Sequence, residues 1–291
     1  MTFACTPLDA PLGALVEGFD FDAPVTPEVR DALVDAVDEH LLLLFRNGDA
    51  PPSNQHVVDL CSAVGPLRPT LADKSRLPGY AGINRVSNRD DQGVVGTGGH
   101  GIVTWHSDLS FQPPLIEFLY LDALSIPGHG GDTSWTNLCA AYDALPASTR
   151  AQIDDLGVRY RLREGLDFSS YFKASDPASL FQNTEISLVQ TNPRNGRRGV
   201  WPNTGPDFAV EVQGMSRDAG TELLAELFAH CTRDEFVYRH VWRTGDACLW
   251  LNTHTMHQRE SFPDSDVRVL RHVNSLGRAD PRQSVASPRV A

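Results

Sequence analysis

Short strand-like runs recur in both halves of the chain, and this feature most restricts the folds open to it. The runs have strand length, are rich in aliphatic and aromatic residues, and lie at Leu41–Arg46, Ile116–Leu124, Phe236–Trp242, Ala247–Asn252 and Val267–Leu276. Helical patterns are fewer; the clearest ones cover residues 26–40, 53–64 and 217–231. No linker rich in Gly, Ser or Pro divides the 291 residues. We therefore predict a mainly β protein with flanking helices (α+β), built as one domain on a β-sandwich or jelly-roll core.

The charge balance and the cysteines exclude several classes of protein. The 25 Lys and Arg residues against 37 Asp and Glu give a net charge of −12, which disfavours nucleic acid or an anionic membrane surface as a partner. No apolar run approaches the roughly 20 residues that cross a bilayer. The five cysteines form no CxxC pair, so neither a disulfide framework nor a thiolate zinc site is expected. We expect a cytoplasmic protein whose partner is a small molecule.

One histidine and one aspartate have the spacing of metal ligands. His106 and Asp108 lie in the segment Trp105-His106-Ser107-Asp108. On an extended chain, residues i and i+2 project to the same face, so an imidazole nitrogen and a carboxylate oxygen can point at one position. This is two-thirds of the two-histidine, one-carboxylate triad of non-haem Fe(II) oxygenases. His-x-Asp also arises by chance in a chain of this length, so a third ligand is required.

The third ligand has two candidates far along the chain, and an arginine follows them. His254 and His257 come just after the strand-like run 247–251, and three residues separate them, so on a strand only one could face the site. In the run that follows, Arg268 and His272 share one face of a strand with period two. An arginine on the inward face of a jelly roll is costly unless it meets an anion, which a dicarboxylate cosubstrate would supply.

These segments resemble the taurine dioxygenase (TauD/TfdA) family of Fe(II)/2-oxoglutarate-dependent dioxygenases. The resemblance rests, in chain order, on WHSDLSFQ, GGDTSWTNLCAAYDALP, LLAELFAHCTRDEFVYRHVWRTGD and HQRESFPDSDVRVLRH. It implies a double-stranded β-helix, the cupin-like form of the jelly roll, over residues 1–291, with N-terminal helices and an insertion or lid around 165–215. It also implies a homo-oligomer, either a dimer or a tetramer.

The resemblance assigns a role to each candidate residue. It implies that His106, Asp108 and His257 are the iron ligands, while His254 falls where the family has a non-ligand residue. It further implies that Arg268 pairs with the distal carboxylate of 2-oxoglutarate and that Thr133 adds a hydroxyl hydrogen bond. O2 is the other cosubstrate. The implied reaction couples decarboxylation of 2-oxoglutarate to succinate with hydroxylation of the substrate; desaturation and epoxidation are alternative outcomes.

The substrate pocket departs from the family pattern. Members that act on sulfonates or aryloxyacetates place an arginine where this chain has His272. We therefore expect a different, larger or less charged organic substrate, such as a natural-product intermediate. The segments that line the family's pocket contain Asn88, Val103, Trp105, Phe111, Phe168, Tyr171, Phe172, Trp201 and Asn203.

Three other functions stay open at this point. The first is a catabolic dioxygenase for aryloxyalkanoates or sulfonates. The second is a non-catalytic jelly roll that binds a ligand, although the intact set of ligand and cosubstrate residues disfavours it. The third is a zinc hydrolase with the same three ligands, which would have no use for Arg268 and Thr133.

Overall fold

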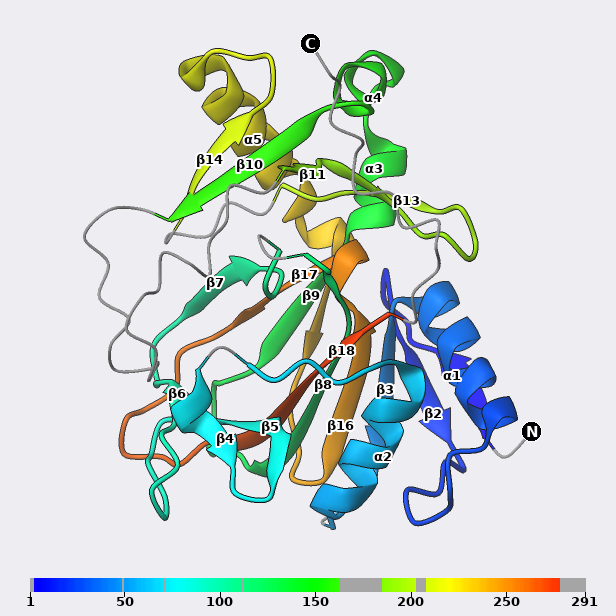
Figure 1. Ribbon diagram of the computed structural model, residues 1–291, viewed down its shortest axis with the longest axis vertical. Coiled ribbons are helices and arrows are strands. Elements are labelled where there is room, and N and C mark those ends of the chain that lie inside the picture. Colours follow the sequence, from blue (N-terminus) through cyan, green and yellow to red (C-terminus); the bar gives the residue numbers. More distant parts are fainter. Residues whose placement is uncertain are drawn as a thin grey trace.

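Two facing sheets form the centre of the molecule. The computed structural model describes residues 3–48, 50–70, 72–110, 113–162, 185–202 and 208–277. Among these residues, one sheet has nine strands and the facing sheet has four (Figure 1). Neighbouring strands are antiparallel except in the pairs β2–β3 and β5–β6. The two sheets form the jelly-roll core that the sequence predicts.

The strands of the large sheet are, in spatial order, β1 (Ala4–Pro7), β2 (Ala14–Glu17), β3 (Leu42–Arg46), β16 (Asp246–Leu251), β8 (Ile116–Ser125), β18 (Val269–Leu276), β5 (Tyr80–Ser87) and β4 (Arg76–Leu77), with β6 (Thr97–Gly98) beside β5. The strands of the small sheet are β15 (Val237–His240), β9 (Thr133–Asn137), β17 (Thr255–Arg259) and β7 (Val103–His106).

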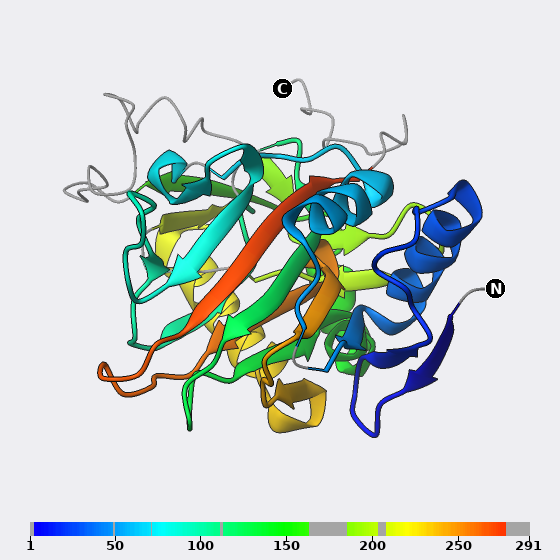
Figure 2. The same cartoon turned by 90° about the horizontal axis from the view of Figure 1, so that it is seen from below.

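Two helices cover the outer face of the large sheet. They are α1 (Pro27–His40) and α2 (Asn54–Val64), and they begin after Thr26 and Ser53, whose side chains accept hydrogen bonds from backbone N–H groups of the first turn. Their apolar sides pack on β3, β8 and β16 in one large hydrophobic core, which also contains Trp135 of the facing sheet. Seen from below, β8, β18 and β5 run side by side with α2 beside them (Figure 2).

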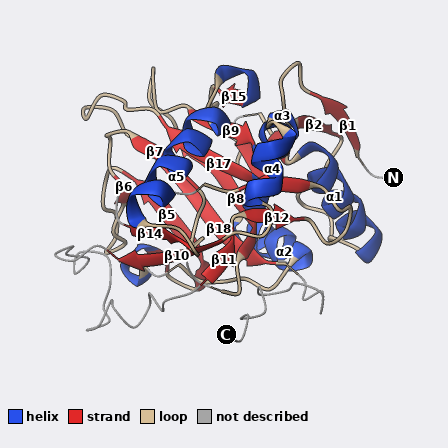
Figure 3. Cartoon of the chain, turned by 90° about the horizontal axis from the view of Figure 1, so that it is seen from above, coloured by secondary structure: helices blue, strands red, loops and turns tan. Residues whose placement is uncertain are grey.

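A second hydrophobic core lies on the outer face of the small sheet. It joins Met256 of β17 to α3 (Leu138–Ala144) and α5 (Arg217–Cys231), which lie above the sheets in Figure 3. The remaining elements here are α4 (Ala147–Ile153), the three-stranded sheet β11 (Glu185–Ser187), β10 (Gly157–Leu162) and β14 (Phe208–Val212), and the hairpin β12 (Val189–Thr191) and β13 (Arg198–Val200). Short 3₁₀ turns in the described ranges cover Asp73–Ser75, Asp234–Phe236 and Asn252–His254.

Most predicted elements are confirmed, but the small sheet contains strands that the predicted runs do not cover. Residues 136–145 also have the pattern of a short helix, but the helix begins at Leu138, because Thr136 and Asn137 complete β9. β17, which carries His257, also lies outside the predicted runs. The expected insertion around 165–215 falls partly outside the described residues. Within the described part of the chain, no helix is both long and apolar enough to cross a membrane.

Candidate metal centre and cosubstrate pocket

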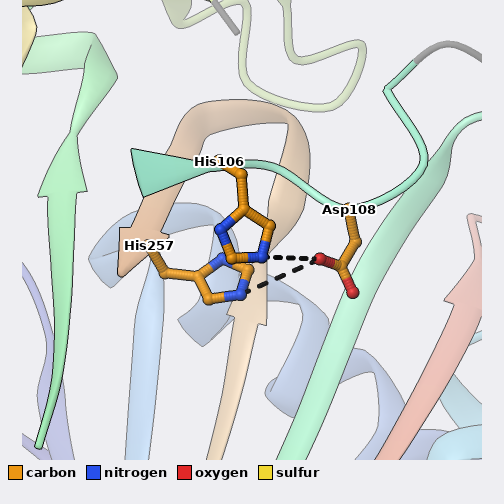
Figure 4. Close-up of side chains that lie close together, drawn as sticks. All are labelled: His106, Asp108 and His257. Atoms are coloured by element: carbon orange, nitrogen blue, oxygen red, sulfur yellow. Dashed lines mark ion pairs between the residues drawn. The ribbon is translucent and has the colours of Figure 1, made fainter. Parts of the chain in front are cut away.

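Two histidines and one aspartate from the small sheet converge on one point. His106 is the last residue of β7, Asp108 follows two residues later, and His257 lies directly opposite His106 in the β7–β17 pair. One ligand atom from each of the three side chains lies within 4.8 Å of the others. Figure 4 shows the three side chains turned toward one another. The side chains of His106 and Asp108 therefore point at one position, as their spacing in the sequence predicts.

The distances and protonation states suit a divalent cation. The Nε2 atoms of His106 and His257 lie 3.2 and 3.9 Å from Asp108 Oδ1, and the two imidazole centroids are 4.1 Å apart. Burial and the neighbouring His106 hold the pKa of His257 well below its usual range, so this imidazole is neutral. Burial opposes ionisation of Asp108, but hydrogen bonds from His106 and His272 outweigh it and hold the pKa of the carboxyl well below its usual range. A neutral imidazole and a carboxylate are the forms that bind a metal.

His106 also has the orientation of a metal ligand. Its Nδ1 lies 2.8 Å from the carbonyl oxygen of Thr104, which leaves Nε2 for the convergence point. Burial lowers the pKa of His106, but the hydrogen bond with Asp108 outweighs this effect and raises it. A cation bound to Asp108 would take the place of that proton. The donor set of two imidazole nitrogens and one carboxylate oxygen therefore fits iron.

The loop that carries Asp108 is fixed by groups from distant segments. Asn252 accepts a hydrogen bond from the Asp108 N–H at 3.0 Å and donates to its carbonyl oxygen at 2.9 Å. Ser107 donates to the Thr255 carbonyl oxygen at 2.7 Å and accepts from Trp201 Nε1 at 2.6 Å. These bonds hold the backbone on both sides of the carboxylate, and the convergence point is thus organised by the fold itself.

His254 lies away from this point. It ends the 3₁₀ turn before β17 and is 2% exposed. Its Nδ1 lies 2.9 Å from Thr253 Oγ1, and its ring packs against Gly199 of β13. Burial lowers its pKa to about 4. The structure thus separates the two histidines that the sequence spacing leaves as alternatives, and only His257 joins the cluster.

Arg268 is a buried cation without a described anionic partner. It is 2% exposed; its Nε donates to the Gly131 carbonyl oxygen at 3.1 Å, and its Nη2 lies 3.5 Å from Thr133 Oγ1. Among the described residues it makes no ion pair. Burial and the nearby charge of Arg259 lower its pKa to about 9. This guanidinium is short of negative charge, and a ligand carboxylate would supply it.

Thr133 has its hydroxyl hydrogen available for such a ligand. Trp242 Nε1 donates to Thr133 Oγ1 at 2.9 Å, and Arg268 Nη2 approaches the same oxygen. A hydroxyl oxygen that accepts from two donors still has its own hydrogen to donate. The sequence does not indicate this role of Trp242, because the role depends on a contact between β9 and the segment after β15.

Other predicted pocket residues have different surroundings. His272 faces the cluster, with Nε2 3.3 Å from Asp108 Oδ2. Asn88 supports the segment of Arg268: it accepts from the Arg268 N–H at 3.1 Å and donates to the Asp266 carbonyl oxygen at 2.8 Å. Val103 pairs with Arg259 at the irregular end of β7. Trp105 and Trp201 pack in the second hydrophobic core, and Trp201 reaches the site through Ser107.

The remaining pocket candidates lie outside the described residues. They are Phe111, Phe168, Tyr171, Phe172 and Asn203.

Comparisons with known proteins agree with this geometry. Residues 4–274 match the family model described as taurine catabolism dioxygenase TauD, TfdA family. Pentalenolactone F synthase of Streptomyces avermitilis is 30% identical, with 91% of each chain covered. The alpha-ketoglutarate-dependent 2,4-dichlorophenoxyacetate dioxygenase of Cupriavidus pinatubonensis is 32% identical, with 95% of this chain and 98% of the relative covered. The crystal structure of AAD-2 in complex with Mn(II) and N-oxalylglycine has a TM-score of 0.76 at 29% identity and covers 96% of this chain and 99% of its own.

The chain belongs to the TauD/TfdA family. It is a non-haem dioxygenase that depends on Fe(II) and 2-oxoglutarate.

Proposed function

We propose that His106, Asp108 and His257 bind the Fe(II) of this dioxygenase, and that Arg268 and Thr133 bind the distal carboxylate of 2-oxoglutarate. The observation that carries this proposal is the convergence of three ligand atoms within 4.8 Å. The buried Arg268, with no described ion pair, supports the second half. When bound, the iron couples O2 to the decarboxylation of 2-oxoglutarate and to oxidation of the substrate.

The chain's own residues have separable tasks in this proposal. The two imidazoles and the carboxylate would hold the metal, with three protein ligands that leave coordination positions for cosubstrates. Arg268 and Thr133 orient 2-oxoglutarate by one charged contact and one hydroxyl contact. Asn252 and Ser107 keep Asp108 in position. The side chains of His106 and Asp108 are 28% and 21% exposed, so the site is open for a substrate to approach.

We further propose that the substrate is a small organic molecule of the natural-product type rather than taurine or an aryloxyacetate. His272 replaces the arginine that the family uses for a substrate anion, and its Nε2 already lies 3.3 Å from Asp108 Oδ2. A relative named pentalenolactone F synthase supports this choice, and relatives named for phenoxyacetates support the alternative of a catabolic dioxygenase.

Succinate release tests both parts of the proposal. The pure protein, with Fe(II), 2-oxoglutarate and O2, is assayed with taurine, 2,4-dichlorophenoxyacetate, an alkyl sulfate ester and a panel of neutral polycyclic compounds. We expect substrate-stimulated succinate formation only with members of the neutral panel. Turnover of taurine or the aryloxyacetate at the rate of a dedicated enzyme would contradict the substrate proposal. Asp108→Ala is the control that must abolish every response.

The wider setting of the protein is also a proposal. We infer that residues 1–291 act as one domain with an insertion around 165–215, in a cytoplasmic homodimer or homotetramer. Light scattering coupled to size exclusion measures the assembly, and a monomer at micromolar concentration would contradict it.

A further inference from the structure

A row of side chains on the large sheet faces the candidate metal centre. His272 of β18 lies opposite Asn84 of β5 and opposite Leu121 of β8. Directly opposed residues of antiparallel strands project to the same side of a sheet. His272 reaches Asp108, so this is the side of the metal centre, and Asn84 projects to it as well.

Asn84 is a buried side chain that has no hydrogen-bond partner in the described part of the chain. It is 2% exposed, and both its Nδ2 and its Oδ1 are shielded from solvent and unpaired. Among the described residues it is the one side chain with two such atoms. Exchanging the two ends of the amide would change nothing, because one donor group and one acceptor stay unpaired either way. Buried polar groups are normally paired, so a bound molecule can supply the partner that the described residues do not give Asn84.

A second amide on the same face extends this polar site. Asn274 follows His272 by two residues on β18, is 2% exposed, and its Oδ1 has no partner. Across the β18–β5 pair, Asn274 is a diagonal neighbour of Asn84. One small functional group can bridge the distance between two such side chains. Together the two amides offer one NH₂ group and two carbonyl oxygens.

The charged residues next to Asn84 and Asn274 make their contacts with other groups. His272 has Nε2 at Asp108, and Arg271 projects to the opposite face, where it pairs with Asp122. Arg76 lies opposite Asn84 on β4, and its Nε donates to the Thr70 carbonyl oxygen at 3.1 Å.

Building on the proposed function, we propose that Asn84 and Asn274 bind an uncharged head group of the substrate that both donates and accepts hydrogen bonds. A carboxamide or a hydroxyl group has this chemistry. A carboxylate or a sulfonate only accepts, so it would leave both carbonyl oxygens unpaired and would add a negative charge beside Asp108. Asn84 is thus a specificity-determining residue for this reaction, in place of the arginine that position 272 lacks.

The first test needs no ligand. Removing an unpaired buried amide with an apolar side chain of similar shape should stabilise the ligand-free protein, so we expect Asn84→Leu to raise Tm by about 2 °C or more. The matched control is Asn88→Leu, which breaks two hydrogen bonds and should lower Tm. Asn84→Ala adds no bulk and serves if leucine does not fit. A fall in Tm for both Asn84 variants, as large as that of Asn88→Leu, would overturn the proposal.

The second test measures head-group preference by calorimetry. The protein is loaded with Mn(II) and N-oxalylglycine and titrated with two matched pairs of probes: phenylacetamide against phenylacetate, and cyclohexanecarboxamide against cyclohexanecarboxylate. We expect each carboxamide to bind at least about tenfold more tightly than its carboxylate. Asn84→Leu should remove this preference and leave the affinity for N-oxalylglycine within about twofold.

The outcomes separate this inference from the proposed function. If N-oxalylglycine itself fails to bind with Mn(II), both are overturned. If it binds but the carboxylates bind more tightly, or no carboxamide binds, only the head-group inference is overturned. In that case, a loss of carboxylate binding in the Arg76→Gln variant would assign the recognition of the anion to Arg76 of β4.

Discussion

The hydroxyl oxygen of Thr133 lies 3.5 Å from Nη2 of Arg268, and the two residues belong to segments of different sheets. Thr133 begins β9 in the small sheet, and Arg268 directly precedes β18 in the large one. The contact therefore joins the two sheets at the proposed cosubstrate site. Because Trp242 donates to the same oxygen, the hydroxyl hydrogen of Thr133 remains for the ligand.

Replacing Thr133 should weaken 2-oxoglutarate binding and leave the chemistry intact. Thr133→Val keeps the shape but loses the donor, so we expect KM for 2-oxoglutarate to rise about tenfold, equivalent to about 1.4 kcal/mol, with kcat changed by less than about twofold. Thr133→Ser keeps the hydroxyl and should stay close to the wild type. Equal KM values for the valine and serine variants would contradict the proposed contact.

Replacing Arg268 should affect binding more than folding. Arg268→Gln removes a charge-assisted contact with a carboxylate, and we expect 2-oxoglutarate to bind about 30- to 100-fold more weakly. The free energy of unfolding of the ligand-free protein should stay the same or rise, because the variant removes a buried cation without a described anionic partner. Arg233→Gln, at an exposed ion pair with Glu235, is the control for a change of charge alone. Tight cosubstrate binding by Arg268→Gln would exclude this arginine as the anchor.

Arg271, three residues further along, should have the opposite profile. Its guanidinium pairs with Asp122 on the other face of β18 and also binds Asn54 Oδ1 at 2.6 Å. Arg271→Met leaves the fully buried Asp122 unpaired, so we expect a loss of about 3–5 kcal/mol in the free energy of unfolding. Chemical denaturation measures this loss. The double variant Arg271→Met, Asp122→Leu should recover part of it, and a stable single variant would contradict the structural role.

His254 should make the fold sensitive to acid. Its pKa is about 4 in the folded protein against an ordinary value near 6.5, so below pH 6.5 the unfolded chain takes up a proton that the folded chain does not. Stability is lost progressively as the pH falls from about 6.5 to about 4, and the total loss reaches about 3 kcal/mol at the lower end. His254→Gln removes the pH-dependent contribution of this imidazole to the unfolding free energy. The difference in unfolding free energy between wild type and variant should therefore depend on pH in this window, and a constant difference would contradict the prediction.

The pattern of the chain predicts the metal cluster better than its surroundings. The spacing of His106 and Asp108 is local: His106 ends β7, Asp108 follows in the next turn, and two residues of separation bring both side chains to one position. The choice between His254 and His257 is not local: it depends on the 3₁₀ turn over Asn252–His254, which places the buried His254 ring against Gly199 of β13. The resemblance to a family decides this choice where spacing alone leaves it open.

Residues whose importance comes from a neighbour on another strand have no signal in one sequence. In the sequence, Trp242 resembles any core tryptophan; only the structure shows that its Nε1 donates to Thr133 Oγ1. Likewise, only the structure shows that the Asn84 amide is unpaired beside His272. The sequence patterns do not predict the strands β9 and β17 for a related reason. Their short, polar sequences lack a strong period, and their place in the small sheet is decided by pairing with each other and with β7 and β15.

The most direct test of the central claim is an anaerobic titration of the pure protein with Fe(II) in the presence of 2-oxoglutarate, followed by visible absorption. Chelation of the iron by the cosubstrate should produce a weak charge-transfer band that saturates at one iron per chain. His257→Ala and His106→Ala should abolish the band, whereas His254→Gln should retain it. Absence of the band from the wild-type protein, or its loss in His254→Gln with retention in His257→Ala, would contradict the assignment of His106, Asp108 and His257 as the iron site.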